Sequence, residues 1–206
     1  MVPRVKITGT ARVTCPACGR DRDASLVQSI NTQNDPEAKQ KLLAGELNLL
    51  VCDCGRRTQL VSELLYYDPI GELSIYVSPE SGKGDQVFES VGAQGTQRLV
   101  PSPNALVEKI KIADAGLEDW VVEMVKVLLL ASLPEPDLDR VLLFDRVEDD
   151  RVHWVMFGTA PREMQSPMAA YHRLAARTQA RPKPTERRID RAWALEAVQQ
   201  MMKGGN

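Results

Sequence analysis

Long apolar runs are missing from this chain of 206 residues. The longest, residues 125–132, includes Lys126 and is far shorter than the roughly 20 residues that a membrane-spanning helix needs. The first ten residues show no apolar stretch after their basic residues, so no secretory signal is expected. We therefore expect a cytoplasmic protein without membrane association. Its thiols would stay reduced, so paired cysteines indicate metal or redox chemistry rather than structural disulfides.

Histidine is equally scarce, with only His153 and His172 in the chain, both far in sequence from the cysteines. Neither stands in a recognisable nucleophile–base arrangement. The segment SGKGD at residues 81–85 lacks the rest of a phosphate-binding loop motif and is interpreted as a plain loop. No acid–base pair of carboxylates is defined by spacing alone. The expectation is a protein that is not an enzyme.

Basic residues exceed acidic ones only near the end of the chain. Residues 159–206 hold nine Lys/Arg against four Asp/Glu, whereas residues 1–158 hold 17 against 24. An acidic body with a basic tail differs from the broad basic surface of a dedicated nucleic-acid binder. The tail is either solvated or used for association.

All four cysteines lie in two short motifs, Cys-Pro-Ala-Cys-Gly and Cys-Asp-Cys-Gly, separated by 33 residues. Four thiolates complete a closed tetrahedral Zn²⁺ site, and a glycine after each pair lets the chain bend back. The second motif is one residue shorter, so its turn must be tighter. The alternative is four buried free thiols. The predicted zinc ligands are Cys15, Cys18, Cys52 and Cys54.

Five arginines flank the motifs, with aspartates between them. They either form a basic patch that contacts phosphate or offset the negative charge of a zinc–thiolate centre. The interleaved acids and the lack of a nearby aromatic residue for base stacking favour charge compensation. These arginines are Arg12, Arg20, Arg22, Arg56 and Arg57.

The residue patterns predict an α+β fold: a zinc-ribbon-like β module, then helices and a β-hairpin, then a helical tail. Strands are expected at residues 4–15, 23–32, 48–52, 57–68, 72–79, 139–149 and 150–158, and helices at 34–47, 102–116, 117–132 and 189–203. Residues 80–97, rich in Gly and Ser, are expected to be mostly a loop. The expected domains are residues 1–79, an α+β remainder at 80–160, and a linker and tail at 161–206.

The last predicted helix carries apolar side chains on two adjoining faces, together with a tryptophan and a methionine-rich end. Such residues suit docking into the groove of a protein partner, pairing with a second copy of the chain, or packing back on their own domain. The candidate contact residues are Trp193, Leu195, Val198, Met201 and Met202.

Three stretches, TCPACG, SINTQNDPEAKQKLLAGELNLLVCDCG and LLYYDPIGELSIYVSP, resemble the CpXC family of bacterial and archaeal proteins. The resemblance covers residues 5–79 and continues more weakly through the next helices. It implies a zinc-ribbon-like domain of uncharacterised function, with Cys15, Cys18, Cys52 and Cys54 as ligands. The departure is Cys-Asp-Cys where the family has Cys-Pro-x-Cys.

Three functions follow from these patterns. The first is a zinc-stabilised module that binds another protein. The second is a redox sensor, since oxidation of zinc-bound cysteines releases the metal. The third is nucleic-acid binding through the flanking arginines and the basic tail, which the acidic body disfavours.

Overall fold

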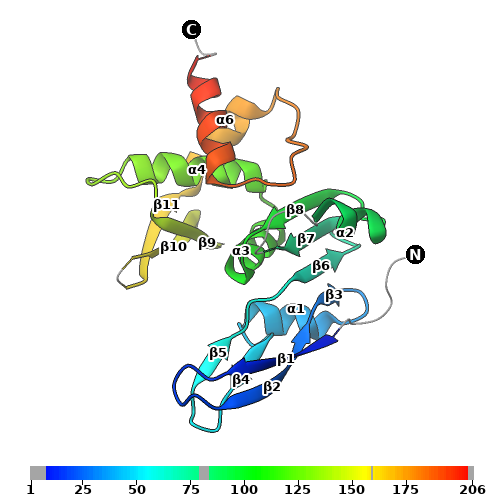
Figure 1. Ribbon diagram of the computed structural model, residues 1–206. Helices are drawn as coiled ribbons and strands as arrows, with labels where there is room; N and C mark the ends of the chain where they lie inside the picture. Colours follow the sequence, from blue (N-terminus) through cyan, green and yellow to red (C-terminus); the bar gives the residue numbers. More distant parts are fainter. Residues whose placement is uncertain (1–7, 79–83, 159, 204–206) are drawn as a thin grey trace. The chain divides into compact units, whose positions relative to one another are not determined.

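The computed structural model describes residues 8–78, 84–158 and 160–203. The chain divides into two compact units, Met1–Val107 and Glu108–Asn206 (Figure 1). This division differs from the boundaries expected after residues 79 and 160. Strand pairing draws residues 96–100 into the first unit, and helix packing keeps the tail in the second.

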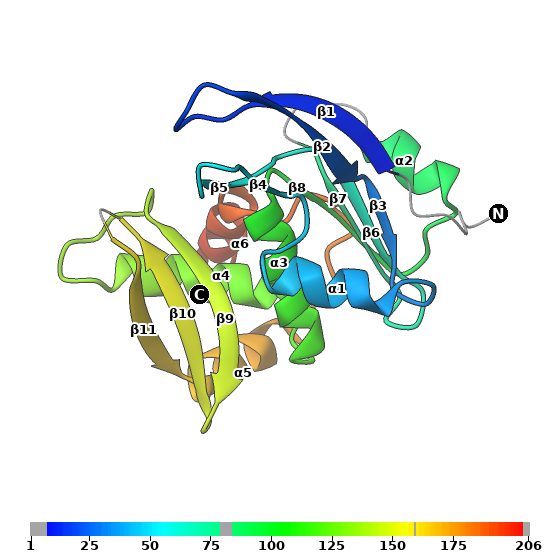
Figure 2. The ribbon, with the colours of Figure 1, turned by 90° about the horizontal axis from the view of Figure 1, so that it is seen from below.

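The first unit contains two β-hairpins, a four-stranded sheet and two short helices. Its strands are β1 (Thr8–Thr14), β2 (Asp21–Val27), β3 (Ser29–Asn31), β4 (Leu49–Val51), β5 (Arg57–Gln59), β6 (Leu64–Asp68), β7 (Leu73–Val77) and β8 (Thr96–Val100). Its helices are α1 (Pro36–Leu43) and α2 (Gly84–Ser90). The antiparallel pairs β1–β2 and β4–β5 are separate two-stranded sheets, and Figure 2 shows them from below.

The four-stranded sheet has the order β3-β6-β7-β8. Its central pair is antiparallel and both outer pairs are parallel. Every residue of β7 is buried, which explains why this strand is a continuous run of mostly apolar residues. At the start of helix α1, the side chain of Asp35 accepts a hydrogen bond from the Ala38 N–H (3.1 Å), and Pro36 follows in the first turn.

Helix α2 corrects the expectation of a loop at residues 80–97. Phe88 and Val91 are buried against Leu65 and Tyr76 of the sheet. The helix has only seven residues and is flanked by glycines, so its sequence carries too few turns for a helical period to stand out. Tertiary packing, rather than local propensity, holds it. Residues 80–83 of this expected loop, and residue 79 at the end of an expected strand, lie outside the described residues.

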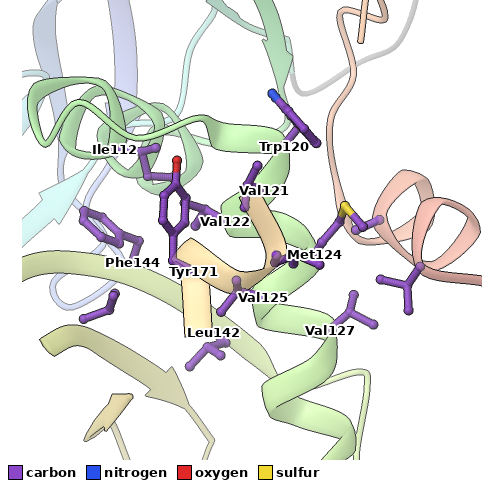
Figure 3. Packing of buried hydrophobic residues seen from close by; sticks show 14 of the residues in the cluster. Ile112, Trp120, Val121, Val122, Met124, Val125, Val127, Leu142, Phe144 and Tyr171 are labelled. Atoms are coloured by element: carbon purple, nitrogen blue, oxygen red, sulfur yellow. The ribbon is translucent and has the colours of Figure 1, made fainter. Parts of the chain in front are cut away.

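The second unit packs helices against a three-stranded antiparallel sheet of order β11-β10-β9. Its elements are the end of α3 (Pro103–Asp114), α4 (Asp119–Ala131), β9 (Val141–Glu148), β10 (Arg151–Phe157), β11 (Arg162–Pro167), α5 (Met168–Thr178) and α6 (Arg191–Lys203). Side chains from α4, β9 and α5 meet in the core, as Figure 3 shows for Val125, Phe144 and Tyr171. Trp154 packs edge-on against Phe144, and its indole N–H donates to Ser166 Oγ (2.9 Å).

Helix α6 packs against α4 within this core. Val198 and Met201 are buried, and Trp193 and Leu195 pack against the same cluster. Of the five predicted partner contacts, only Met202 is largely exposed, at 72%. Most of the apolar side chains of α6 therefore pack on their own unit. Helix α4 is apolar on most sides, and packing against α6 shields part of that surface from water. Among the described helices, none combines the length and apolar character that a membrane span requires.

Candidate metal centre

The first cysteine motif forms a turn that is closed by backbone hydrogen bonds. Cys15 follows β1, and its N–H donates to the carbonyl oxygen of Arg20 at 2.9 Å. The N–H of Gly19 donates back to the Cys15 carbonyl, also at 2.9 Å. Gly19 has φ +69°, in the left-handed region that glycine adopts without steric cost. The glycine therefore lets the chain reverse after Cys18 and enter β2.

The second motif makes the same kind of turn with one residue fewer. Here the Cys52 N–H donates to the Arg56 carbonyl (2.9 Å), and the Gly55 N–H donates to the Cys52 carbonyl (2.8 Å). Gly55 has φ +84°. The shorter Cys-Asp-Cys sequence thus closes a tighter loop. Both of its sulfur atoms still lie within 4.8 Å of those of the first motif.

The four sulfur atoms all lie within 4.8 Å of one another. Cys15 Sγ is 3.8 Å from Cys54 Sγ, and Cys18 Sγ is 3.6 Å from Cys52 Sγ. A tetrahedral zinc site with Zn–S bonds of about 2.3 Å has sulfur–sulfur edges of about 3.8 Å. These two distances across the hairpins match that edge, and all four cysteines are free thiols. The donor set and its size therefore fit a tetrahedral metal ion.

Backbone N–H groups already stabilise negative charge on these sulfurs. The N–H of Ala17, and then that of Cys18, donates to Cys15 and lowers the pKa of its thiol. The N–H of Cys54 does the same for Cys52 and lowers its pKa to about 6. For Cys18, the Arg20 N–H acts in the same direction, but desolvation and the neighbouring thiols outweigh it and raise the pKa to about 11. Such N–H···S bonds orient metal ligands from outside the coordination sphere.

Burial divides the four cysteines into two pairs. Cys15 and Cys52, the first cysteine of each motif, are 1% and 3% exposed, whereas Cys18 and Cys54 are exposed. The first cysteine of each motif is therefore shielded from solvent, and the second is open to it.

Two of the arginines around the centre form ion pairs with neighbouring aspartates. Arg22 pairs with Asp53, the middle residue of the second motif, and also hydrogen-bonds Cys52, which raises the pKa of the Arg22 guanidinium. Arg12 pairs with Asp21 across the first hairpin at 3.1 Å. The contact of Arg22 with the cysteine turn supports charge compensation. Sequence spacing alone did not single it out, because Arg22 comes from the other hairpin.

The histidines stand away from any such cluster. His153 is buried in β10, with Nε2 3.7 Å from a Glu148 carboxylate oxygen. His172 is exposed on α5 and packs edge-on against Tyr171. Across the described residues, the four cysteines are the one group of three or more potential ligand side chains with metal-binding spacing.

An α+β protein with a four-cysteine cluster between two hairpin turns is the class that the fold and the site define. The profile of the CpXC protein family matches residues 13–126, more than half of the chain. The chain belongs to the CpXC family, as the cysteine motifs predicted. No curated protein and no solved structure matches it.

Proposed function

We propose that Cys15, Cys18, Cys52 and Cys54 bind one Zn²⁺ ion in a closed structural site of the zinc-ribbon type. The observation that carries the proposal is the set of four free thiols with sulfur–sulfur distances of 3.6 and 3.8 Å across the hairpins. Four thiolates fill the tetrahedron, so substrate has no coordination position to enter. The site therefore serves folding rather than catalysis.

We further propose that the zinc-stabilised unit binds another protein, in a reducing, cytoplasmic environment. The support is the exposure of three apolar side chains in this unit, Val51, Val61 and Ile70, at 61%, 61% and 82%, and Val51 directly precedes a cysteine turn. Replacing Val51 and Val61 together by Ser should reduce partner recovery in a pull-down and leave the metal content unchanged. Equal recovery with both forms would remove this surface from the proposal.

The metal site is tested by elemental analysis of protein purified without added metal, combined with a count of reactive thiols. We expect one zinc per chain, with four thiols that react only after chelation. Cys54→Ser should lower the zinc content and shift the far-ultraviolet circular dichroism towards the unfolded form, because metal binding and folding of such modules are coupled.

Asp53→Asn is the matched control, because Asp53 lies between two ligands but offers no sulfur. It should keep one zinc per chain while losing only its ion pair with Arg22. Metal-free protein with four freely reactive thiols would overturn the proposal. So would iron in place of zinc, because a four-thiolate site also suits iron.

A redox sensor is a second candidate, favoured by the exposure of Cys18 and Cys54 beside buried partners. A peroxide would take two electrons from two thiolates. With hydrogen peroxide as the oxidant, one disulfide and two molecules of water would form as two protons are taken up, and the metal would leave. Cys15 and Cys54 lie 3.8 Å apart on opposite hairpins, and Cys18 and Cys52 lie 3.6 Å apart, so we expect oxidation to join one of these two pairs.

Zinc release under mild peroxide, with disulfides mapped by peptide mass spectrometry, tests the sensor. Fast release with cross-hairpin disulfides would favour it over a purely structural site. Zinc that leaves only when the protein is denatured would count against it, and the structural site would stand.

A further inference from the structure

The second unit contains a cavity of about 170 Å³ between α4, α6 and the segment that follows α5. Trp120 and Met124 contribute from α4, and both are buried. Trp193, on the first turn of α6, is partly buried and lines the same cavity. Figure 3 shows Trp120 and Met124 on α4 beside the segment that leads into α6. The cavity thus brings together two of the three tryptophans of the chain.

The segment between α5 and α6, which lines one side of this cavity, is held in place by contacts with the rest of the unit. Pro182 and Pro184 stiffen the segment between α5 and α6, and Lys183 between them pairs with Glu118. Further along, the buried Lys109 ammonium donates to the Ile189 carbonyl at 3.1 Å. The Asp190 carboxylate then accepts from the Trp193 N–H at 3.1 Å and caps the start of α6. Both ends of the wall are anchored, so the cavity is preformed.

The charged side chains that line the cavity are two glutamates and one arginine, so the lining is acidic by one charge. Glu196 is exposed at its edge and enters no ion pair with another described residue. Glu186 adds a second carboxylate, and Arg181 is the opposing cation. Indole rings attract cations through their negative faces, and a carboxylate adds to that preference.

We propose that this cavity binds an organic cation, an alkylammonium or guanidinium group on a short apolar stem. The stem would contact Met124 and the two indoles, and the charge would lie near Glu196. Drug-sized ligands fill pockets of about 300–1,000 Å³, so this cavity takes a ligand the size of a side chain rather than a nucleotide. The cation comes either from a free small amine or from a Lys or Arg side chain of a peptide.

The inference is separate from the metal centre, which lies in the other unit. Intrinsic tryptophan fluorescence reports directly on ligand binding in the cavity, because Trp120 and Trp193 line the cavity whereas Trp154 is buried in the core. The full-length zinc-loaded protein is titrated with n-butylguanidinium and n-butylammonium chloride at constant ionic strength, with n-butanol as the neutral control. We expect a saturable change in emission with both cations and none with butanol.

Two surface variants test the charge preference without disturbing the core. Glu196→Gln should weaken binding roughly threefold or more, the loss expected for an exposed charge pair. Arg181→Ala should tighten binding roughly twofold by removing a like charge. Glu163→Gln, an exposed carboxylate on β11, is the control and should leave affinity unchanged.

A capped tripeptide with a central arginine distinguishes the two sources. Tighter binding of the peptide assigns the cation to a polypeptide, and tighter binding of the free amine assigns it to a small molecule. Either result supports the proposal. It is overturned by the absence of a saturable signal, by equal binding of butanol, or by Arg181→Ala weakening the binding of both cations, because the arginine would then not oppose the bound charge.

Discussion

Met201 and Met202 are neighbours on α6, yet their side chains have opposite environments. Met201 is 8% exposed and belongs to the core of the second unit, whereas Met202 is 72% exposed. Consecutive residues on a helix point about 100° apart, so one can face the core while the next faces solvent. The same substitution can therefore be compared at a buried and at an exposed methionine of one helix.

We expect Met201→Lys to lower the free energy of unfolding by about 2 kcal/mol or more, because it buries a charge and removes apolar contact. Met202→Lys should change it by about 0.5 kcal/mol or less. Urea unfolding followed by tryptophan fluorescence measures both. Equal losses in the two variants would mean that α6 presents a different face to the core.

Asp145 on β9 provides a test of acid sensitivity. Lys111 donates a hydrogen bond to it at 2.6 Å, and that bond, with a second from Arg146, lowers the pKa of its carboxyl. A lowered pKa means that the folded state prefers the charged carboxylate. The resulting stability is therefore complete above the unfolded pKa of about 3.9 and is lost as the pH falls through the folded value.

Asp145→Asn should lower the free energy of unfolding by about 1 kcal/mol or less at neutral pH. The difference from the natural protein should shrink at about pH 3, below the unfolded pKa of about 3.9, because the unfolded state then gains a proton that the folded state takes up less readily. Urea unfolding at the two pH values measures it. A difference that stays constant down to acid pH would show that packing, not charge, is responsible.

Helices α3 and α4 are joined by a buried charge cluster, which is unusual for core-facing elements. Lys109, 4% exposed in its side chain, lies 2.9 Å from Asp119 and 3.1 Å from Glu123. Lys126 on α4 reaches Glu108 at 3.0 Å, and Glu108 also accepts from the Phe144 N–H at 2.6 Å. Burial raises the pKa of Glu108, whereas the two lysines outweigh burial at Glu123 and lower its pKa.

Removing one member of such a cluster leaves an unpaired buried charge. Lys109→Met should therefore lower the free energy of unfolding by about 3–5 kcal/mol. Lys111→Met, two residues away in the same helix, breaks a more exposed pair with Asp145 and should cost about 1 kcal/mol or less. Chemical denaturation of both variants under the same conditions gives the comparison. Similar losses at the two positions would contradict the assigned burial.

At the scale of the whole molecule, one apolar cluster belongs to a single unit. It runs from Ile112 to Met201 and contains only residues of the second unit. All three tryptophans, Trp120, Trp154 and Trp193, also belong to that unit. Tryptophan emission therefore reports on the second unit, and the proposed zinc centre belongs to the first.

Chelation of the metal should unfold the two hairpins and change the far-ultraviolet circular dichroism, because their short sheets have little apolar surface to bury. The tryptophan emission should stay at its folded value during the same treatment. Adding back one equivalent of zinc should restore the dichroism. A parallel loss of tryptophan emission would show instead that the two units fold as one.

Much of the candidate site could be predicted from the sequence, because the ligands within each motif are only a few residues apart. Cys15 and Cys18 are joined by a turn of a few residues, and a glycine with positive φ is needed wherever such a turn reverses. The pattern also indicated that two such turns share one ion, and the sulfur distances agree. The particular partner of Arg22 could not be predicted from the sequence, since its contact with Asp53 joins two separate hairpins.

The amphipathic and apolar periods of α3, α4 and α6, and the β9–β10 hairpin, were likewise determined by the sequence alone. Which surfaces those elements cover was decided only by the tertiary structure. The apolar faces of helix α6 suited a protein partner, a second copy of the chain or its own domain, and in the structure they pack against α4. The reason is physical: hydrogen bonds and turns act over a few residues, whereas burial of apolar surface depends on which distant segments arrive to exclude water.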